Sequence, residues 1–307
     1  MTALFQCVPN LSEGRRPEVV QALADSVGSV AGVTLVDHSC DKDHNRMVLS
    51  LLGEAGPLEQ AILSLYRAAD QHLNVHQHQG AHPRIGAVDV VPFVPVWGAT
   101  MEQAVALARA TAEKVADELQ VPVFLYAEAA RREAYRSLTW LRRGQLEGLS
   151  KDLGAERMPD FGPPALHSRL GATVVGARSP LVAYNVVLDT ADLEVARQVA
   201  RRIRESTGVL RWVQAMGVML EERGRAQVSM NLVDPQRTSL YTALETVRME
   251  ARRFGVSVLD SEIVGLAPLE CLVETARYYL QLPDFRSTQV LEAQILGLLA
   301  REEKPAS

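Results

Sequence analysis

The sequence predicts an α/β (α+β) protein in which two halves repeat the same order of strands and helices. Three observations lead to this fold class. The chain has 307 residues, the length of about two ordinary domains. Hydrophobic residues make up 47% of it and charged residues 22%, which is the composition of a globular chain rather than a disordered one. Segments with strand and helix periodicity alternate in a pattern that occurs twice.

The first half is expected to fold as strand, helix, strand, strand, helix and strand. Pro17 suits the first turn of a helix, and apolar residues recur at helical spacing after Pro57. The last segment is rich in β-branched residues, which favours a strand. In order, the predicted elements are Ala3–Val8, Pro17–Val30, Val33–Val36, Met47–Leu52, Pro57–His72 and Ile85–Val96.

The second half repeats this order, with a likeness to the split β-α-β pattern of ferredoxin-like sheets. We therefore expect two ferredoxin-like β-α-β-β-α-β subdomains side by side, with a ligand groove between them. The predicted elements are Leu181–Leu188, Ala191–Glu205, Arg211–Leu220, Arg225–Val233, Thr238–Phe254 and Val256–Val264, with a turn at 221–224.

Additional elements are expected outside the two repeats. A helix at Met101–Leu119, a strand at Val121–Tyr126 and short helices up to Leu153 follow the first repeat. The stretch rich in proline and glycine at 158–164 is a candidate boundary loop. Arg286–Ala300 is expected to form a terminal helix.

Composition and charge exclude several classes of function. The net charge is −5, so the chain as a whole does not attract nucleic acid or an anionic membrane. No apolar run approaches 18 residues and the start lacks a secretory leader, which predicts a soluble, cytoplasmic protein. Three widely spaced cysteines fit a reduced compartment without a disulfide framework. Four lysines leave 28 arginines among 32 basic residues, so a single arginine is weak evidence for a binding site.

The richest polar segment runs from His72 to Gly86. All seven histidines precede residue 168, and His82 lies in a polar, glycine-containing loop just before a hydrophobic strand. An imidazole there can act as a general base because it titrates near neutral pH. The alternatives are solvated histidines at a helix end, or a metal site built from His72 and His76 with His78 or His82.

Two further polar connections lie near strand ends. Asp41 to Arg46 lacks the glycine and the glutamate of a calcium loop, so either Asn45 and Arg46 bind an anion or the segment is an exposed charged turn. After the first strand, Ser12 either caps the following helix, or Asn10 and Glu13 reach the same cleft as His82. The common nucleotide-binding and serine-hydrolase motifs are absent.

Several blocks together resemble the glutamate formiminotransferase family. They are CVPNLSEG at 7–14, NR at 45–46, HQGAHPRIGAVDVVPFVPV at 78–96, VPVFLYAEAAR at 121–131, PDFGPP at 159–164, GATVVGAR at 171–178, AQVSMNLVD at 226–234 and VSVLDSEIVGLAPLECL at 256–272. The resemblance is to the formiminotransferase part of formiminotransferase-cyclodeaminase, without the cyclodeaminase domain. It implies an N-terminal subdomain at 1–178 and a C-terminal subdomain at 179–307.

The resemblance implies transfer of a formimino group between the N5 nitrogen of tetrahydrofolate and the amino group of L-glutamate, in histidine degradation. It implies a folate-binding, cytoplasmic homodimer of one-carbon metabolism that uses tetrahydrofolate as co-substrate and needs no metal. Nucleic acid and membrane partners are not expected. The alternatives are a glutamate formyltransferase that uses 5-formyltetrahydrofolate, a non-catalytic folate or amino-acid binding module, and a metal-dependent enzyme.

Matched residue by residue, the family's catalytic histidine falls on His82. An aspartate that supports catalysis in animal members aligns with Ser39, so Asp37 or Asp41 would have to replace it. Substrate contacts are expected from Asn10, Glu13, Asn45, Arg46 and Arg84, with the two arginines on carboxylates. The family's folate contacts fall on Pro163, Pro164, Ala165, Leu166, His167, Ser168, Arg169, Leu170, Gly171 and Ala172, although 164–170 departs from the family pattern.

Overall fold

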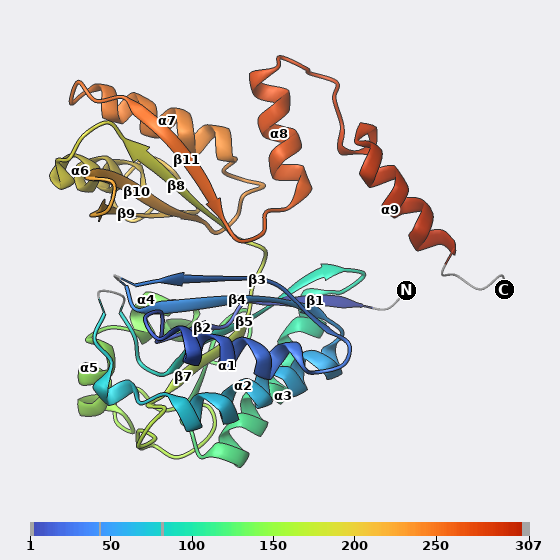
Figure 1. Ribbon diagram of the computed structural model, residues 1–307, viewed down its shortest axis with the longest axis vertical. Coiled ribbons are helices and arrows are strands. Elements are labelled where there is room, and N and C mark those ends of the chain that lie inside the picture. The colour runs from blue at the N-terminus through green and yellow to red at the C-terminus, as the bar shows by residue number, and fades with distance from the viewer. Residues whose placement is uncertain (1–2, 43, 81–82, 303–307) are drawn as a thin grey trace. The chain divides into compact units, whose positions relative to one another are not determined.

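A computed structural model of the chain describes residues 3–42, 44–80 and 83–302. The chain divides into two compact units, and the division falls between Arg178 and Ser179. Figure 1 shows the elements of both units. Each unit has its own sheet and its own hydrophobic core, so each is described by itself.

The first unit contains the predicted elements and several more. Its strands are β1 (Leu4–Cys7), β2 (Asn10–Leu11), β3 (Val33–Asp41), β4 (Arg46–Gly53), β5 (Val88–Trp97), β6 (Val123–Ala127) and β7 (Thr173–Ala177). Its α-helices are α1 (Pro17–Gly28), α2 (Ala55–His72), α3 (Met101–Leu119), α4 (Leu138–Leu141) and α5 (Gln145–Asp152), with short 3-10 turns η1 (Val75–Gln77) and η2 (Glu133–Arg136).

The strand order of the first sheet confirms the predicted repeat. The first strand is broken into β1 and β2, which both pair with β4 on one side and β5 on the other, and β3 pairs with β4. All these pairs are antiparallel, as the split β-α-β pattern requires. Beyond β5 the sheet continues with β7 and then β6, both in parallel pairing. The site described below lies around β2 and the starts of β4 and β5.

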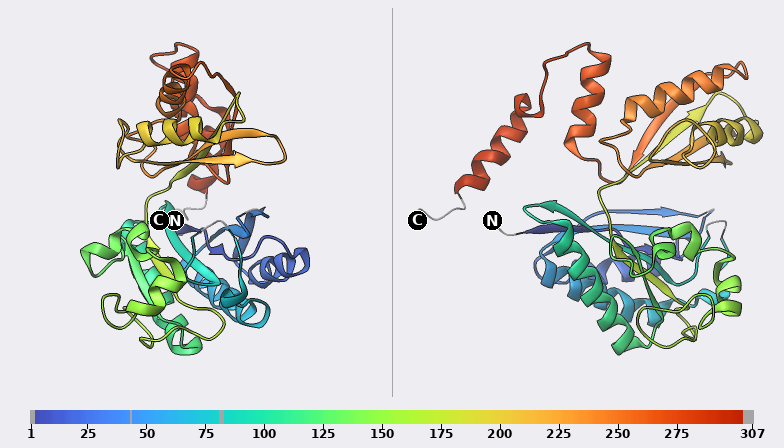
Figure 2. Two further views of the ribbon diagram at one scale, coloured as in Figure 1. Left: turned by 90° about the vertical axis from the view of Figure 1, so that its left-hand side faces the viewer. Right: turned by 180° about the vertical axis from the view of Figure 1, so that it is seen from behind.

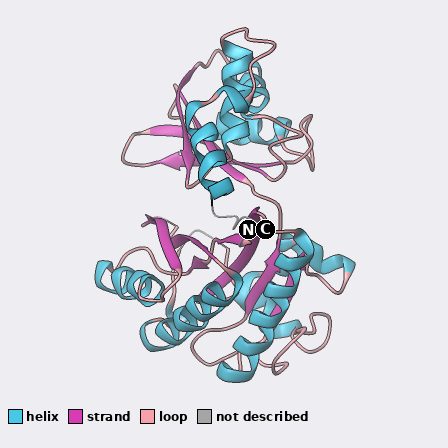
Figure 3. Cartoon of the chain, turned by 90° about the vertical axis from the view of Figure 1, so that its right-hand side faces the viewer, coloured by secondary structure: helices cyan, strands magenta, loops and turns pink. Residues whose placement is uncertain are grey.

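Helices cover the first sheet unequally on its two faces. α1, α2 and α3 lie on one face and form the main core with the strands, as Figure 3 shows. On the other face, η2, α4 and α5 cover only the part formed by β5, β7 and β6, where Tyr135 packs edge-on against Phe124 with ring centroids 5.7 Å apart. The polar side of β3 therefore stays exposed.

The second unit is a four-stranded antiparallel sheet in the order β11-β8-β10-β9. This order also confirms a ferredoxin-like subdomain. Two helices on one face close its core, and two further helices follow the sheet (Figure 2). The elements are β8 (Val182–Leu188), α6 (Leu193–Ile203), β9 (Val213–Leu220), β10 (Arg225–Leu232), α7 (Leu240–Arg252), β11 (Val258–Val264), α8 (Leu269–Tyr279), η3 (Ser287–Gln289) and α9 (Leu291–Glu302).

Three expectations about local structure are wrong. Ser12 does not cap α1, because its hydroxyl donates to the carbonyl of Gly86 (2.7 Å) and Arg16 occupies the N-cap position. The stretch at 158–164 is not a boundary, since the amide of Val123 in β6 donates to Phe161 and the chain stays in the first unit up to Arg178. The strand expected at Val33–Val36 does not end at Val36, because β3 runs on to Asp41.

Two further features concern the cysteines and the helices of both units. Cys7, Cys40 and Cys271 are all free thiols, as their spacing predicts. In the part of the chain that the structure describes, no helix is both long and apolar enough to span a bilayer.

Candidate active site

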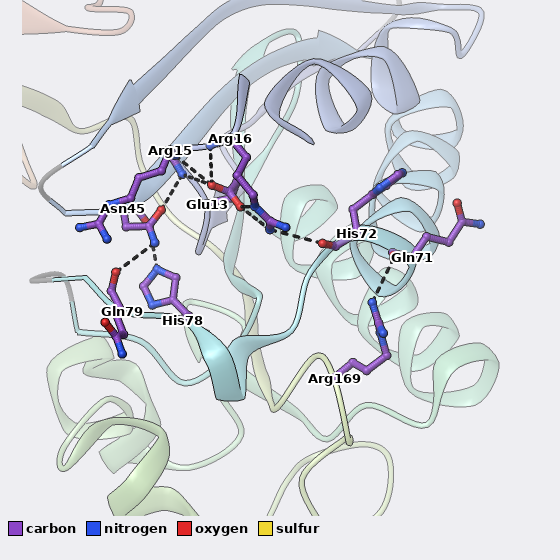
Figure 4. Close-up of polar contacts among 10 residues, drawn as sticks. Glu13, Arg15, Arg16, Asn45, Gln71, His72, His78, Gln79 and Arg169 are labelled. Atoms are coloured by element: carbon purple, nitrogen blue, oxygen red, sulfur yellow. Dashed lines mark hydrogen bonds and ion pairs between the residues drawn. The ribbon is translucent and has the colours of Figure 1, made fainter. Parts of the chain in front are cut away.

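The turn between β2 and α1 is organised by a buried carboxylate, Glu13. Its Oε1 accepts hydrogen bonds from the amides of Gly14, Arg15 and Arg16 at 2.9–3.0 Å, and its Oε2 accepts from the Arg16 side chain at 2.6 Å (Figure 4). Burial raises the pKa of Glu13, but these hydrogen bonds outweigh it and hold the pKa below its ordinary value. Both oxygens are engaged by its own loop, so Glu13 shapes the turn that follows β2.

Asn45 holds three separate segments together. Its Oδ1 accepts from the amide of Gly14 (2.9 Å), and its Nδ2 donates to the carbonyl of Gln79 (3.0 Å). Its own carbonyl accepts from Nε2 of His78 (2.8 Å). Figure 4 shows this arrangement. Asn45 adopts a positive φ of 49°, which asparagine tolerates better than most residues and which turns the chain into β4. The segment that leads to His82 is thereby fixed against β4.

A small polar cavity lies where these segments meet. It is lined by Asn10, Leu11, Ser12, Asn45, Arg46, His78 and Asp89 and has a volume of about 10 Å³. A cavity of that size has room for one water-sized group. Several of its lining residues are only half-buried, so the cavity is at the surface of the first unit.

Arg46 supplies a half-buried positive charge to this cavity. Its guanidinium donates to Oδ1 of Asn10, its Nε has no hydrogen-bond partner among the described residues, and it forms no ion pair within 4.0 Å there. Burial, together with the nearby Arg142, lowers the pKa of Arg46 to about 10, while Asp89 and Asp41 oppose this shift. A half-buried guanidinium with unused donors is suited to binding a carboxylate.

Arg84 differs from Arg46 in being already paired. Its guanidinium lies 3.0 Å from the carboxylate of Glu147 and also donates to Gln145 (3.2 Å). This ion pair lowers the pKa of Glu147, chiefly through the hydrogen bond from Arg84. Arg84 further donates to the carbonyl of His78 (3.4 Å). In this arrangement Arg84 ties α5 to the histidine-rich segment.

Asp89 is the second buried carboxylate of the site. It lies at the start of β5, is 2% exposed, and forms an ion pair with Arg142 at the end of α4. Its other oxygen accepts from the amide of Ile85 (2.7 Å). The bend that follows Pro83 and Arg84 is thereby closed onto the strand.

The stretch expected to contact folate is hydrogen-bonded to the histidine-rich segment. The amide of Ala87 donates to Leu170 (2.9 Å), and that of Ala172 donates to Ile85 (3.0 Å). Arg169 donates to the last carbonyls of α2, at Asp70 (2.6 Å) and Gln71 (3.0 Å). Pro164, Ala165 and Ser168 remain exposed. Two segments about eighty positions apart in the chain therefore form one surface.

The structure brings together Asn10, Asn45 and Arg46, and it places Glu13 in the turn beside them. His82 lies outside the described residues. Asp37 and Ser39 are half-buried on β3, and the carboxylate of Asp41 accepts from His44 (2.8 Å).

The sequence did not single out three groups of this site. The sequence pattern indicates His78 only as a metal ligand, and it gives no role to Asp89 or Arg142. A carboxylate within the apolar run Val88–Val91 is a signal that could have identified Asp89. Arg142 gives no such signal, because its partner is 53 positions away.

The described histidines do not support a metal cluster. Within residues 3–42, 44–80 and 83–302, no three His, Cys, Asp or Glu side chains lie close enough together to hold an ion. His76 is exposed and lies 3.4 Å from the carbonyl of His167, whereas His78 faces Asn45.

Comparisons with known proteins cover almost the whole chain. Residues 4–178 match the formiminotransferase domain, N-terminal subdomain, and residues 183–299 match the formiminotransferase domain. The chain is 43% identical over 97% of its length to all of a glutamate formimidoyltransferase from Streptococcus pyogenes, and 40% identical over 95% to 97% of one from Thermoplasma acidophilum. It is 40% identical over 91% of its length to 53% of the formimidoyltransferase-cyclodeaminase of Rattus norvegicus.

Proposed function

This chain belongs to the formiminotransferase family and is a transferase, and we propose that it is a glutamate formimidoyltransferase. Its reaction moves a formimino group between the N5 nitrogen of tetrahydrofolate and the amino group of L-glutamate, within histidine degradation. The family uses tetrahydrofolate as a co-substrate. The observation that carries the proposal is the 43% identity to a protein of that name, which extends over 97% of this chain and all of the relative.

The proposed base is His82. The amino group must be neutral to attack the formimino carbon, so a base has to remove a proton from the ammonium or from the tetrahedral adduct. His82 then returns a proton to the nitrogen that leaves. Support comes from its position in the HPRIG motif, directly before the segment 83–89 that closes onto β5.

Arg46 is the proposed partner of a substrate carboxylate. It is half-buried and has no carboxylate within 4.0 Å among the described residues, whereas Arg84 is paired with Glu147. Asn10 and Asn45 hold Arg46 and the neighbouring segments in place. Fixing two substrates beside one base supplies much of the acceleration of a transfer reaction.

Residues 163–172 are proposed to contact folate. Their hydrogen bonds to Ile85 and Ala87 join them to the segment that follows His82, which supports a common binding surface. We assign residues 1–178 as the N-terminal subdomain, which carries the catalytic histidine, and 179–307 as the C-terminal subdomain. We further propose a cytoplasmic homodimer, and the three free thiols agree with a reducing compartment.

The decisive experiment is a coupled assay with tetrahydrofolate and N-formimino-L-glutamate. The wild-type protein is expected to turn over, and His82→Ala is expected to lower kcat by about 10²–10⁴-fold, the usual contribution of a general base. Both proteins should have the same circular dichroism spectrum. His72→Ala is the matched control, because the His72 side chain is exposed and no hydrogen bond involves its ring among the described residues.

Other results would redirect the assignment. Turnover only with 5-formyltetrahydrofolate would identify a formyltransferase, and folate binding without turnover would identify a binding module. Full activity of His82→Ala would remove His82 from the role of base.

A further inference from the structure

His78 lines the polar cavity, and its two ring nitrogens differ in their hydrogen bonding. Its Nε2 lies 2.8 Å from the carbonyl oxygen of Asn45. A carbonyl oxygen only accepts, so Nε2 carries the proton and donates. In the neutral ring, Nδ1 is then a bare acceptor.

Nothing among the described residues satisfies this acceptor. Nδ1 of His78 is buried and has no hydrogen-bond partner there. Burial lowers the pKa of His78, the hydrogen bond to Asn45 opposes this shift, and the charge of Arg84 acts in the same direction as burial, so the net decrease favours the neutral ring. A buried polar atom without a partner is rare in a folded protein and calls for an occupant.

The cavity defines the size of that occupant. His78 lines it with Asn10, Ser12, Arg46 and Asp89, and its volume of about 10 Å³ admits one water-sized group. An NH or NH₂ group has that size. His78 also lies four positions before the proposed base, on the segment that Asn45 fixes.

We propose that Nδ1 of His78 accepts a hydrogen bond from the terminal nitrogen of the formimino group, and that this contact selects a formimino over a formyl group. The inference rests on the proposed function and deepens it. The terminal nitrogen of a formimino group carries an N–H in both its neutral and its protonated form. The oxygen of a formyl group carries none, and it would place a lone pair against the lone pair of Nδ1.

Two substitutions test the roles of the two ring nitrogens of His78 independently. His78→Gln places an amide nitrogen near Nε2, so it keeps the hydrogen bond to Asn45 and removes the acceptor at Nδ1. His78→Asn places an oxygen near Nδ1, so it keeps the acceptor and loses the bond to Asn45. His72→Gln is the control for the same change at an exposed histidine of the preceding helix.

The readout is the ratio between the inhibition constant of N-formyl-L-glutamate and the KM of N-formimino-L-glutamate in the same assay. His78→Gln is expected to lower this ratio by about 10–100-fold, because a hydrogen bond to a buried acceptor is lost for one ligand only. His78→Asn is expected to keep the ratio within about threefold while lowering kcat through the loosened loop.

Two outcomes would overturn this inference but leave the proposed function standing. One is a ratio in His78→Gln equal to that of the wild-type protein, as expected if a bound water occupies the cavity. The other is a ratio that is lowered in His78→Asn and kept in His78→Gln. Absence of turnover by the wild-type protein would instead overturn the proposed function, and this inference with it. If His78→Gln fails to fold, the ratio in His78→Asn still tests the inference. A ratio equal to that of the wild-type protein supports a hydrogen-bond acceptor at this position, and a lowered ratio contradicts it.

Discussion

Glu13 lies in a motif that is expected to bind substrate, but its carboxylate stabilises the turn between β2 and α1. It is 3% exposed, and its two oxygens accept from three amides and one guanidinium of the same turn. A carboxylate satisfied by backbone amides in this way is stabilised in its charged form. Its contribution to stability is therefore present above its ordinary pKa of 4.5 and is lost as pH falls through the lower pKa of the folded state.

Glu13→Gln is expected to reduce the free energy of unfolding by about 1–3 kcal/mol at pH 7, because the amide nitrogen then faces the Arg16 side chain. The difference from the wild-type protein should shrink as pH falls below 4.5. Urea unfolding at several pH values measures both quantities. Glu18→Gln, at an exposed position in the first turn of α1, is the control and should change stability by less than about 0.5 kcal/mol. A difference that is constant with pH would contradict this account.

The backbone after His82 and the backbone at the end of the 163–172 stretch cross so closely that no side chain fits between them. Gly86 and Gly171 form an isolated bridge, flanked by the hydrogen bonds of Ile85 and Ala87. A methyl group on Gly86 would overlap the carbonyl oxygen of Ala172. The two segments can therefore approach this closely only because glycine, which has no side chain, lies at the crossing.

Gly86→Ala should destabilise the first unit by about 1–3 kcal/mol and should lower activity, because the backbone must separate at the crossing. Thermal unfolding and the coupled assay measure these effects. Gly28→Ala is the matched control at the end of α1, where an added methyl group meets no atom within 4 Å, and it should be neutral or slightly stabilising. Equal behaviour of the two variants would show that the crossing tolerates a side chain.

Long periodic segments were predictable from the sequence, whereas elements that depend on distant partners were not. α3 spans Met101–Leu119 as predicted, because its apolar spacing and its Thr100 cap are local signals. β7 was missed, since five residues become a strand only through β5 and β6. α8 was also missed, and most of its residues stay partly exposed.

The candidate site shows the same limit. Asn10, Asn45 and Arg46 could be selected because each is a polar residue near a strand end. Their meeting in one cavity with His78 depends on hydrogen bonds that span 31 to 36 positions, which no local pattern encodes.

Among the described residues, the main core of the first unit and the core of the second unit share no residue. One lies under the first sheet and is built around β4, β5 and α2, and the other lies between the second sheet and α6 and α7. Leu51 and Leu188 are fully buried members of the two cores. Because each core is closed by its own helices, a defect in one is expected to leave the other intact.

Leu188→Ala should cost the second unit about 2–5 kcal/mol, the usual effect of removing a buried leucine side chain. Hydrogen exchange followed by mass spectrometry should then be faster in peptides from β8 to β11 and unchanged in β4 and β5. Leu51→Ala should give the reverse pattern. Faster exchange throughout the chain in both variants would identify a single cooperative unit instead.

The place of β7 in the first sheet also governs the order in which the nascent chain can assemble. β6 pairs with no described strand except β7. In the sheet β7 lies between β6 and β5, but it is the last strand of the first unit to be synthesised. At 5–20 residues per second, a ribosome needs roughly 2–9 s to pass from Ala127 to Thr173. During that interval β6 has no strand to join, and the first sheet closes only as synthesis of the second unit begins.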